Sequence, residues 1–288
     1  VRPDGSPRVS FVLLAYAQER FVRAAVEGAL AQTLAPLDIL LSDDASPDAT
    51  FEIMREAAAG HDGPHRVRLN RNPRNLGLIG HVNRAMELVR GDFIVVAAGD
   101  DISEPDRALR LAEAWRAGAG RVHLVHSPAL RIDAAGRPGG LVGFNPRLAA
   151  EPAPPLLRFL GWSFVHRGAT AGWSREVFDR FGPLPEGIAE VEDTPIFYRA
   201  ALLGGTAHVD APLVRYRSEG ISRPTRRRRG EVVLFGLHDR VWDWRVACAR
   251  TLLHDLARIE HPDKAAAVAA LEARLAQLAR RRDLARMS

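Results

Sequence analysis

Short apolar runs alternate with segments of helical periodicity through the first half of the chain. The runs Val9–Ala15 and Leu37–Ser42 are short and mostly apolar, which is typical of buried strands. Between them, Gln18–Gln32 places its apolar residues near one face, and this spacing predicts a helix. The same patterns predict further strands at Arg66–Asn70, Asp92–Ala97 and Val122–Ser127, and helices at Ala49–Ala59, Leu78–Val89 and Arg107–Arg116. Strands and helices that alternate with short links predict an α/β fold with a mostly parallel sheet.

The pattern is less regular in the second half of the chain. Residues 133–160 are rich in Gly and Pro and are expected to form loops. The later elements are a strand and helix within Thr170–Phe181, a helix at Thr194–Leu203, a strand at Ala207–Tyr216, and helices at Val232–Ile259 and Lys264–Ala285. We therefore expect one α/β domain over residues 1–220, followed by a basic linker and C-terminal helices over residues 221–288.

Charge is concentrated at the C-terminal end. The chain has 40 Lys and Arg against 35 Asp and Glu, but residues 221–288 alone carry 15 basic and 8 acidic residues. Trp242 and Trp244 lie in this segment beside Arg240 and Arg245, so it suits either peripheral contact with an anionic membrane or a homodimer interface. Because the remainder is slightly acidic and has no basic platform interleaved with aromatic residues, we expect no nucleic-acid partner.

The overall composition is that of an ordinary globular protein, with 47% hydrophobic and 26% charged residues. Cys248 is the only cysteine, which excludes an intrachain disulfide and a cysteine-based zinc site. No apolar run reaches the ~18 residues that would span a bilayer, and Val1–Ser10 does not resemble a signal peptide. We expect a cytoplasmic protein, with peripheral binding to the inner face of the cytoplasmic membrane as the open alternative.

Pairs of acidic residues follow two of the predicted buried strands. Asp43 and Asp44 end one strand, and Asp100 and Asp101 follow another. Parallel strands end at one edge of a sheet, where α/β proteins bind their ligands. Adjacent carboxylates repel each other unless a positive group is present, and Mg²⁺ or Mn²⁺ is one such group. A turn with a helix cap is the alternative for a single pair, but two pairs at one edge favour a ligand site.

A third acidic group precedes the helix at Thr194–Leu203. Glu190, Glu192 and Asp193 lie within four residues, and acids at a helix start are stabilised by the helix dipole. A structural role is therefore sufficient to explain them. If this group folds against the edge that carries the other acids, one of its carboxylates can serve as a general base.

Taken in order, these segments resemble the family 2 glycosyltransferases, which have the GT-A fold. The matching segments are VSFVLLAYAQERFVRAAVEGALAQT, DILLSDDASPDAT, NPRNLG, FIVVAAGDD followed by Pro105, and VEDTPIFYRA. The resemblance implies an inverting glycosyltransferase that uses a nucleotide-diphosphate sugar, linked to UDP or dTDP, and a divalent cation, Mn²⁺ or Mg²⁺. It implies an acceptor hydroxyl on a glycan, a lipid-linked saccharide or a natural product, as in polysaccharide biosynthesis.

The resemblance also implies roles for individual residues. Tyr16 would stack on the nucleobase, and Asp44 would accept a hydrogen bond from a pyrimidine N–H. The expected donor-binding residues are Leu14, Ala15, Tyr16, Asp43, Asp44, Arg74, Asn75, Asp100 and Arg217. Asp100 and Asp101 match the metal and diphosphate motif, although Ala98 stands where the family usually has the first acid.

For the chemical step, the resemblance implies that Asp193 is the general base and that Glu192 is a neighbour that orients it. Trp162 and Glu190 are the candidate acceptor contacts. Two other functions stay open at this point. A nucleotidyltransferase also uses a parallel sheet with paired acids, but its Gly- and Arg-rich phosphate loop is missing from LLAYAQERF. A catalytically degenerate protein that only binds nucleotide sugars would agree with Ala98.

Overall fold

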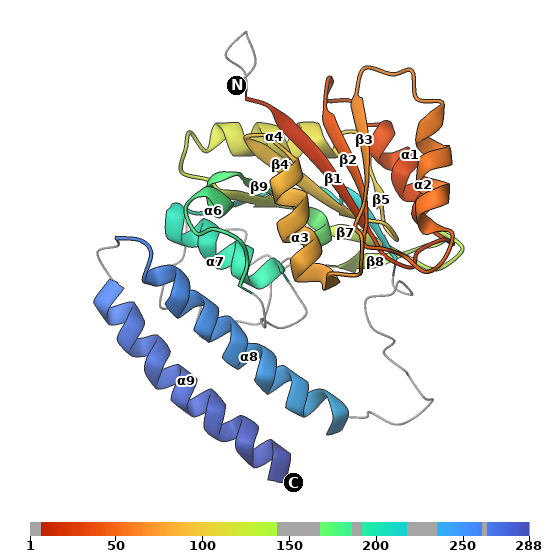
Figure 1. The fold of residues 1–288 in the computed structure, drawn as a ribbon. Coiled ribbons are helices and arrows are strands. Elements are labelled where there is room, and N and C mark those ends of the chain that lie inside the picture. The colour runs from red at the N-terminus through yellow and green to blue at the C-terminus, as the bar shows by residue number, and fades with distance from the viewer. Residues whose placement is uncertain (1–6, 143–167, 186–191, 218–234, 261–263, 288) are drawn as a thin grey trace.

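The computed structural model describes residues 7–142, 168–185, 192–217, 235–260 and 264–287 (Figure 1). The strands of the larger sheet are β1 (Val9–Ala15), β2 (Asp38–Asp43), β3 (Arg66–Arg71), β4 (Phe93–Ala98), β6 (Leu124–His126), β9 (Ala171–Ser174) and β10 (Thr206–His208). A smaller sheet contains β5 (Ile102–Ser103), β7 (Ala129–Ile132), β8 (Pro138–Val142) and β11 (Val214–Arg217). The helices are α1 (Val22–Leu30), α2 (Thr50–Ala59), α3 (Gly77–Leu88), α4 (Arg107–Ala117), α6 (Glu176–Asp179), α7 (Asp193–Leu203), α8 (Phe235–Leu256) and α9 (Lys264–Met287), with a 3₁₀ turn, η2, at Gly168–Thr170.

The larger sheet confirms the predicted mostly parallel α/β architecture. Its strand order is β10-β6-β9-β4-β1-β2-β3, and β9 runs antiparallel to both of its neighbours. Strand β1 lies between β2 and β4 and is parallel to both. The carboxyl ends of these three central strands therefore meet at one edge, which we call the carboxyl edge.

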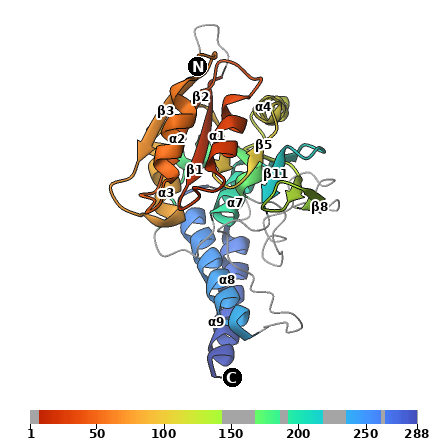
Figure 2. The same ribbon diagram turned by 90° about the vertical axis from the view of Figure 1, so that its right-hand side faces the viewer.

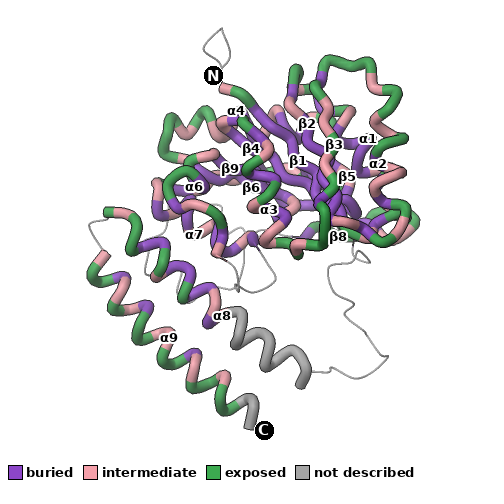
Figure 3. Tube along the Cα trace, viewed as in Figure 1, coloured by how far each residue is buried: buried purple, intermediate pink, exposed green. Residues whose placement is uncertain are grey.

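Helices cover both faces of the sheet, because alternate residues of each strand point to opposite sides. In β1, Phe11 and Leu13 pack with residues of α1, α2 and α4, whereas Val12 and Leu14 pack with residues of α3, α6 and α7. Figure 3 shows the resulting buried strands at the centre of the fold. The apolar runs of the sequence are continuous because both of their faces are buried.

The two C-terminal helices form an antiparallel pair that extends away from the α/β body (Figure 2). A separate apolar cluster joins them to that body, with Phe181 and Leu202 packing against residues of α8 and α9. Within this contact Arg199 of α7 forms a fully buried ion pair with Asp255 of α8. None of the described helices is long and apolar enough to cross a membrane. The boundary expected near residue 220 lies outside the described residues and stays a prediction.

Three predicted elements were wrong in detail. The single strand expected at Ala207–Tyr216 is two strands, β10 and β11, which belong to different sheets. Within the loop expected over residues 133–160, Pro138–Val142 form strand β8. Residues 143–160 lie outside the described residues. The first helix begins at Val22 rather than at Gln18, because the preceding residues form a turn in which the amide of Phe21 donates to the carbonyl of Gln18.

Candidate active site

Strand β1 brings the two predicted acidic pairs to the same edge of the sheet. Ala15 is paired with Asp43 of β2, and Leu14 is paired with Ala98 of β4. Beyond the strand ends, the amide of Asp44 donates to the carbonyl of Ala15 at 3.0 Å, and the amide of Gly99 donates to that of Leu14 at 2.9 Å. The end of β1 therefore lies between the two pairs, as the sequence predicted.

The loops after β1 and β2 are tied together at this edge. Ala17 and Ala45 have positive φ values of 51° and 58°, which residues with a side chain adopt at an energetic cost. The amide of Ala17 donates to Oγ of Ser46 at 2.9 Å, and Ser46 in turn donates from its amide and its hydroxyl to the carboxylate of Asp43. Asp43 therefore holds the two loops in place from a buried position. Tyr16, on the first loop, stays 38% exposed.

Asp44 is held by one of its carboxylate oxygens. Its Oδ1 accepts hydrogen bonds from Nδ2 of Asn72 at 2.8 Å and from the amide of Leu76 at 2.9 Å. Within the part of the chain that the structure describes, Oδ2 has no hydrogen-bond partner. The side chain is only 2% exposed, so its orientation is fixed while one oxygen is left for a ligand.

The loop after β4 is packed tightly against the end of β1. A Cβ atom at Gly99 would overlap Oε1 of Gln18 and lie 2.8 Å from Cβ of Ala15, so the close approach requires glycine. Asp100 and Asp101 follow directly and are 5% and 4% exposed. Oδ1 of Asp101 accepts a hydrogen bond from the amide of Arg217 at 2.8 Å. Burial, with Asp100 next to it, raises the pKa of Asp101 to about 8.

Arg217 holds the loop that carries the second acidic pair. Its Nε donates to the carbonyl of Asp100 at 3.0 Å, and its Nη1 donates to the carbonyls of Asp133 and Ala134 at 2.7 and 2.9 Å. The guanidinium also lies over the ring of Phe21, 4.4 Å from its centroid. The donor contact expected for Arg217 stays a prediction, and these bonds give the residue a role in positioning Asp100.

Sequence reasoning missed Arg107, which is fully buried behind Asp101. Its Nη2 donates to the carbonyls of Val96 and Ala169, and its Nη1 donates to Oγ of Ser103 at 2.8 Å. Burial lowers the pKa of Arg107 to about 9, and the nearby carboxylate of Asp101 opposes this shift. An arginine at the start of an amphipathic helix is usually solvated, so only the fold reveals that it joins β4 to η2.

The residues at this edge fit a small divalent cation. Oδ2 of Asp101 is buried and has no hydrogen-bond donor among the described residues. In the described part of the chain, no group of three or more His, Cys, Asp and Glu side chains is arranged so that it could hold a metal ion. Mg²⁺ and Mn²⁺ commonly take one or two carboxylates from a protein and the remaining ligands from phosphate and water, so two adjacent aspartates suffice.

The third acidic group, at the start of α7, lies against η2. Because η2 leads into β9 and β9 pairs antiparallel with β4, η2 lies near the carboxyl end of β4. A Cβ atom at Gly168 would overlap Oε1 of Glu192 and lie 3.6 Å from Cβ of Asp193. Burial, reinforced by the neighbouring Asp193, raises the pKa of Glu192 to about 7. Oδ1 of Asp193 accepts a hydrogen bond from the amide of Thr194 at 2.8 Å at the start of α7. The structure therefore brings Glu192 and Asp193 near the end of β4.

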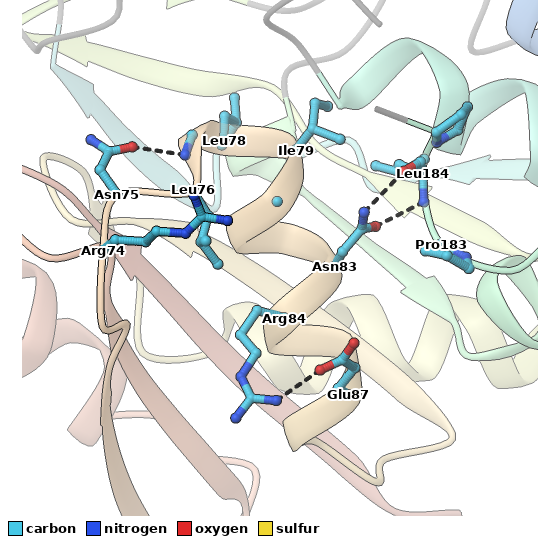
Figure 4. Close-up of a pocket in the computed structure, with 13 residues that line it drawn as sticks. Arg74, Asn75, Leu76, Leu78, Ile79, Asn83, Arg84, Glu87, Pro183 and Leu184 are labelled. Atoms are coloured by element: carbon cyan, nitrogen blue, oxygen red, sulfur yellow. Dashed lines mark hydrogen bonds and ion pairs between the residues drawn. The ribbon is translucent and has the colours of Figure 1, made fainter. Parts of the chain in front are cut away.

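Arg74 and Asn75 line an open cavity of about 870 Å³ along the outer face of α3 (Figure 4). Oδ1 of Asn75 accepts a hydrogen bond from the amide of Gly77 at 2.7 Å, so Asn75 shapes the turn into the helix. The side chain of Asn83 joins α3 to both backbone groups of Leu184 on the opposite wall. Trp162 and Glu190, the candidate acceptor contacts, lie outside the described residues.

Comparison with known proteins agrees with this geometry. Residues 10–127 match the family model described as glycosyl transferase family 2. The succinoglycan biosynthesis protein ExoO of Rhizobium meliloti is 30% identical over 178 residues, which cover 62% of this chain and 49% of ExoO. The chain spans about half or less of the length of the curated relatives it matches first.

Solved structures show the same fold at low sequence identity. TarS of S. aureus, in complex with UDP-GlcNAc, superimposes with a TM-score of 0.62 at 16% identity and covers 95% of this chain and 72% of its own. Glucosyl-3-phosphoglycerate synthase of Mycobacterium tuberculosis, with Mn²⁺, UDP-glucose and phosphoglyceric acid, gives a TM-score of 0.56 at 20% identity, covering 86% and 81%. The predicted GT-A fold is thus confirmed, and residues 10–127 match the model of glycosyl transferase family 2.

Proposed function

We propose that this protein transfers a sugar from a nucleotide-diphosphate donor to a hydroxyl group of an acceptor, with inversion at the anomeric carbon. One observation carries the proposal: Asp44 and Asp100 lie on the two sides of β1 at the carboxyl edge, within the residues that match the family 2 model. The relatives named as glycosyltransferases favour this reaction over nucleotidyl transfer.

The nucleobase end of the donor would bind at the loops after β1 and β2. Oδ2 of Asp44 is available to accept a hydrogen bond from a pyrimidine N–H, and the exposed ring of Tyr16 can stack on the base. TarS and glucosyl-3-phosphoglycerate synthase were each solved with uridine nucleotides, which supports a UDP-sugar as the donor. Leu14 and Ala15 would contribute backbone contacts between the two acidic pairs.

The diphosphate would lie over Asp100 and Asp101, which would hold a divalent cation together with its oxygens. Two solved neighbours, one of them a mannosyltransferase of Pyrobaculum calidifontis, contain Mn²⁺, which supports this assignment. When bound, the cation neutralises charge that develops on the leaving diphosphate. Arg217 and Gly99 position the loop that carries both carboxylates.

Asp193 would act as the general base. It lies at the start of α7, and Glu192 beside it has a raised pKa of about 7. Two neighbouring carboxyl groups can have different roles when one of them stays protonated and the other is ionised and accepts a proton. Asp193 would then accept the proton of the attacking hydroxyl, while the buried Glu192 fixes the position of the helix start against η2.

We further propose that residues 221–288 serve location or assembly. The net positive charge of this segment favours peripheral contact with an anionic membrane from the cytoplasmic side, and a homodimer through the C-terminal helices is the other candidate. Contact with a membrane would bring the active site close to a lipid-linked acceptor. The similarity to ExoO, a succinoglycan biosynthesis protein, supports a saccharide as the acceptor.

The proposal is tested by donor hydrolysis. The protein is incubated with UDP-, dTDP- and GDP-sugars and Mn²⁺, and nucleoside diphosphate release is measured with and without EDTA. We expect slow release from one nucleotide class that EDTA abolishes. Binding of a nucleoside diphosphate without turnover of any donor, even when acceptor saccharides are added, would instead support the degenerate protein.

A further inference from the structure

A chain of hydrogen bonds runs from Asp44 into the core beneath α3, and its members are buried except for Asn70, which is half-buried. Nδ2 of Asn72 donates to Oδ1 of Asp44 at 2.8 Å, and Oδ1 of Asn72 accepts from Nδ2 of Asn70 at 3.0 Å. Nδ2 of Asn70 also donates to Oγ of Ser42 at 3.0 Å, and this hydroxyl lies 2.7 Å from Nε2 of His81. The chain thus connects β2, β3 and α3 to the carboxylate at the carboxyl edge.

Among the described residues, Oγ of Ser42 contacts two polar groups, the side-chain amide of Asn70 and the ring of His81. Both hydrogens of the Asn70 amide are used, one on Ser42 and one on Asn72, so Oγ of Ser42 is an acceptor on that side. The ring of His81 is the remaining polar group at this hydroxyl, so we assign Nε2 of His81 as the acceptor of the Ser42 proton, in the tautomer that carries its own proton on Nδ1. That requires a neutral imidazole, and burial lowers the pKa of His81 although Asp44 and Asp43 oppose the shift.

His81, at the end of the hydrogen-bond chain away from Asp44, determines which groups along it donate and which accept. Without an acceptor at position 81, the Ser42 proton can turn toward Asn70, and the Asn70 amide can rotate so that its oxygen accepts it. Oδ1 of Asn72 would then lose its donor, and nothing would keep Nδ2 of Asn72 directed at Asp44. A buried polar network that is only partly satisfied loses its single ordered state.

We propose that His81 is a positioning residue for nucleobase recognition, acting through Ser42, Asn70 and Asn72 to fix the carboxylate of Asp44. The inference rests on the proposed function, since it assumes that Asp44 receives a pyrimidine N–H. Because His81 is only 3% exposed, it acts through these side chains and not by contact with the nucleobase. It lies one turn inside α3, the helix whose preceding residue, Leu76, also donates to Oδ1 of Asp44.

The test is the affinity of the full chain for UDP in the presence of Mn²⁺, measured by calorimetry. His81→Leu removes the acceptor and is expected to weaken UDP binding roughly 5- to 30-fold, the effect of leaving a buried polar group unpaired. His81→Gln keeps an acceptor near the position of Nε2 and is expected to restore most of the affinity. In steady-state kinetics the donor KM should rise in His81→Leu while kcat changes little.

A matched control separates positioning from general destabilisation. His123 forms a second buried pair with a serine, its Nδ1 lying 3.0 Å from Oγ of Ser174, away from Asp44. His123→Leu breaks an equivalent bond and should leave UDP affinity unchanged. If His81→Leu does not fold, Ser42→Ala interrupts the same chain and should weaken binding equally. In a double-mutant cycle, His81→Leu should add little to Asn72→Ala, because both break one chain.

The possible failures can be told apart. If the wild-type protein binds no nucleotide, the proposed function fails. If the wild type binds UDP and Asp44→Asn weakens it, but His81→Leu and Ser42→Ala bind UDP like the wild type, the donor site stands and the positioning role of His81 is wrong. Equal losses of UDP affinity in His81→Leu and His123→Leu would also overturn the positioning role of His81, since they would show that general destabilisation weakens UDP binding.

Discussion

At the scale of single residues, Asp100 and Asp101 have different surroundings although they are adjacent. Asp101 is anchored through Oδ1 to the amide of Arg217 and faces the buried Arg107. We predict that Asp100→Ala and Asp101→Ala both weaken metal-dependent binding of a nucleoside diphosphate, with Asp101→Ala also lowering stability. Calorimetry with and without Mn²⁺ measures the first effect, and unchanged affinity in both variants would reject the metal assignment.

Glu192 gives a residue-scale prediction about pH. Its folded pKa of about 7 exceeds its unfolded value of 4.5, so its contribution to stability is complete below pH 4.5 and is lost as the pH rises through 7. Glu192→Gln cannot ionise. We therefore expect the variant to become more stable than the wild type by on the order of 2–3 kcal/mol as the pH is raised from 5 to 8.

Urea unfolding at both pH values measures this difference. Glu87, which is exposed, supplies the control, because Glu87→Gln should show no such trend. A stability difference between Glu192→Gln and the wild type that does not depend on pH would mean that the carboxyl group of Glu192 is ionised in the folded protein throughout the range.

At the scale of elements, α7 carries the proposed base and is held by α8. Arg199 and Asp255 are fully buried, with Nε and Nη2 of the arginine 2.8 and 3.1 Å from the carboxylate oxygens. Arg199→Met leaves a buried carboxylate without its partner and should cost about 3–5 kcal/mol of unfolding free energy. The double variant Arg199→Met with Asp255→Leu should recover part of that loss.

The exposed pair Arg84 and Glu87 is the matched control for this prediction. It lies on α3 with both side chains largely in solvent, so Arg84→Ala should change stability by less than about 0.5 kcal/mol. Full additivity of the Arg199 and Asp255 substitutions would contradict an energetic coupling between the two side chains.

The elements also show what could be predicted from the sequence. Strands β1, β2 and β4 were predictable because burial on both faces makes their sequences continuously apolar, and the carboxyl edge followed from their parallel order. The late strand was mispredicted because β10 and β11 follow each other closely in sequence, while Pro212 between them cannot donate to a ladder. The insertion of β9 between β4 and β6 depends on pairings that no local pattern encodes.

The candidate site was predictable to a similar extent. Acidic residues at strand ends are visible as short motifs, and the structure places Asp44 and Asp100 beside β1. Arg107 was missed because it lies on a helix among ordinary residues and its partners come from other elements. His81 also lies on a helix, and its partner Ser42 comes from β2. These partner residues are far apart in the sequence and come together only in the folded structure.

At the scale of the whole molecule, the excess of positive charge and the proposed active site lie in different parts of the chain. The α/β body carries the acidic edge, whereas residues 221–288 carry 15 basic residues against 8 acidic ones. We predict that the full chain floats with liposomes containing anionic lipid at low salt and is released as salt rises through the range in which surface charges are screened. No binding at low salt, together with a dimer in sedimentation that depends on α8 and α9, would favour assembly.

The central claim is that the carboxyl edge joins a donor site to a general base on α7, and one measurement tests it most directly. Turnover of Asp193→Asn is measured beside its affinity for the donor nucleotide with Mn²⁺. The account predicts near-normal affinity and a loss of transfer of about 10²–10⁴-fold, the usual contribution of a general base. Near-wild-type turnover in Asp193→Asn would contradict it.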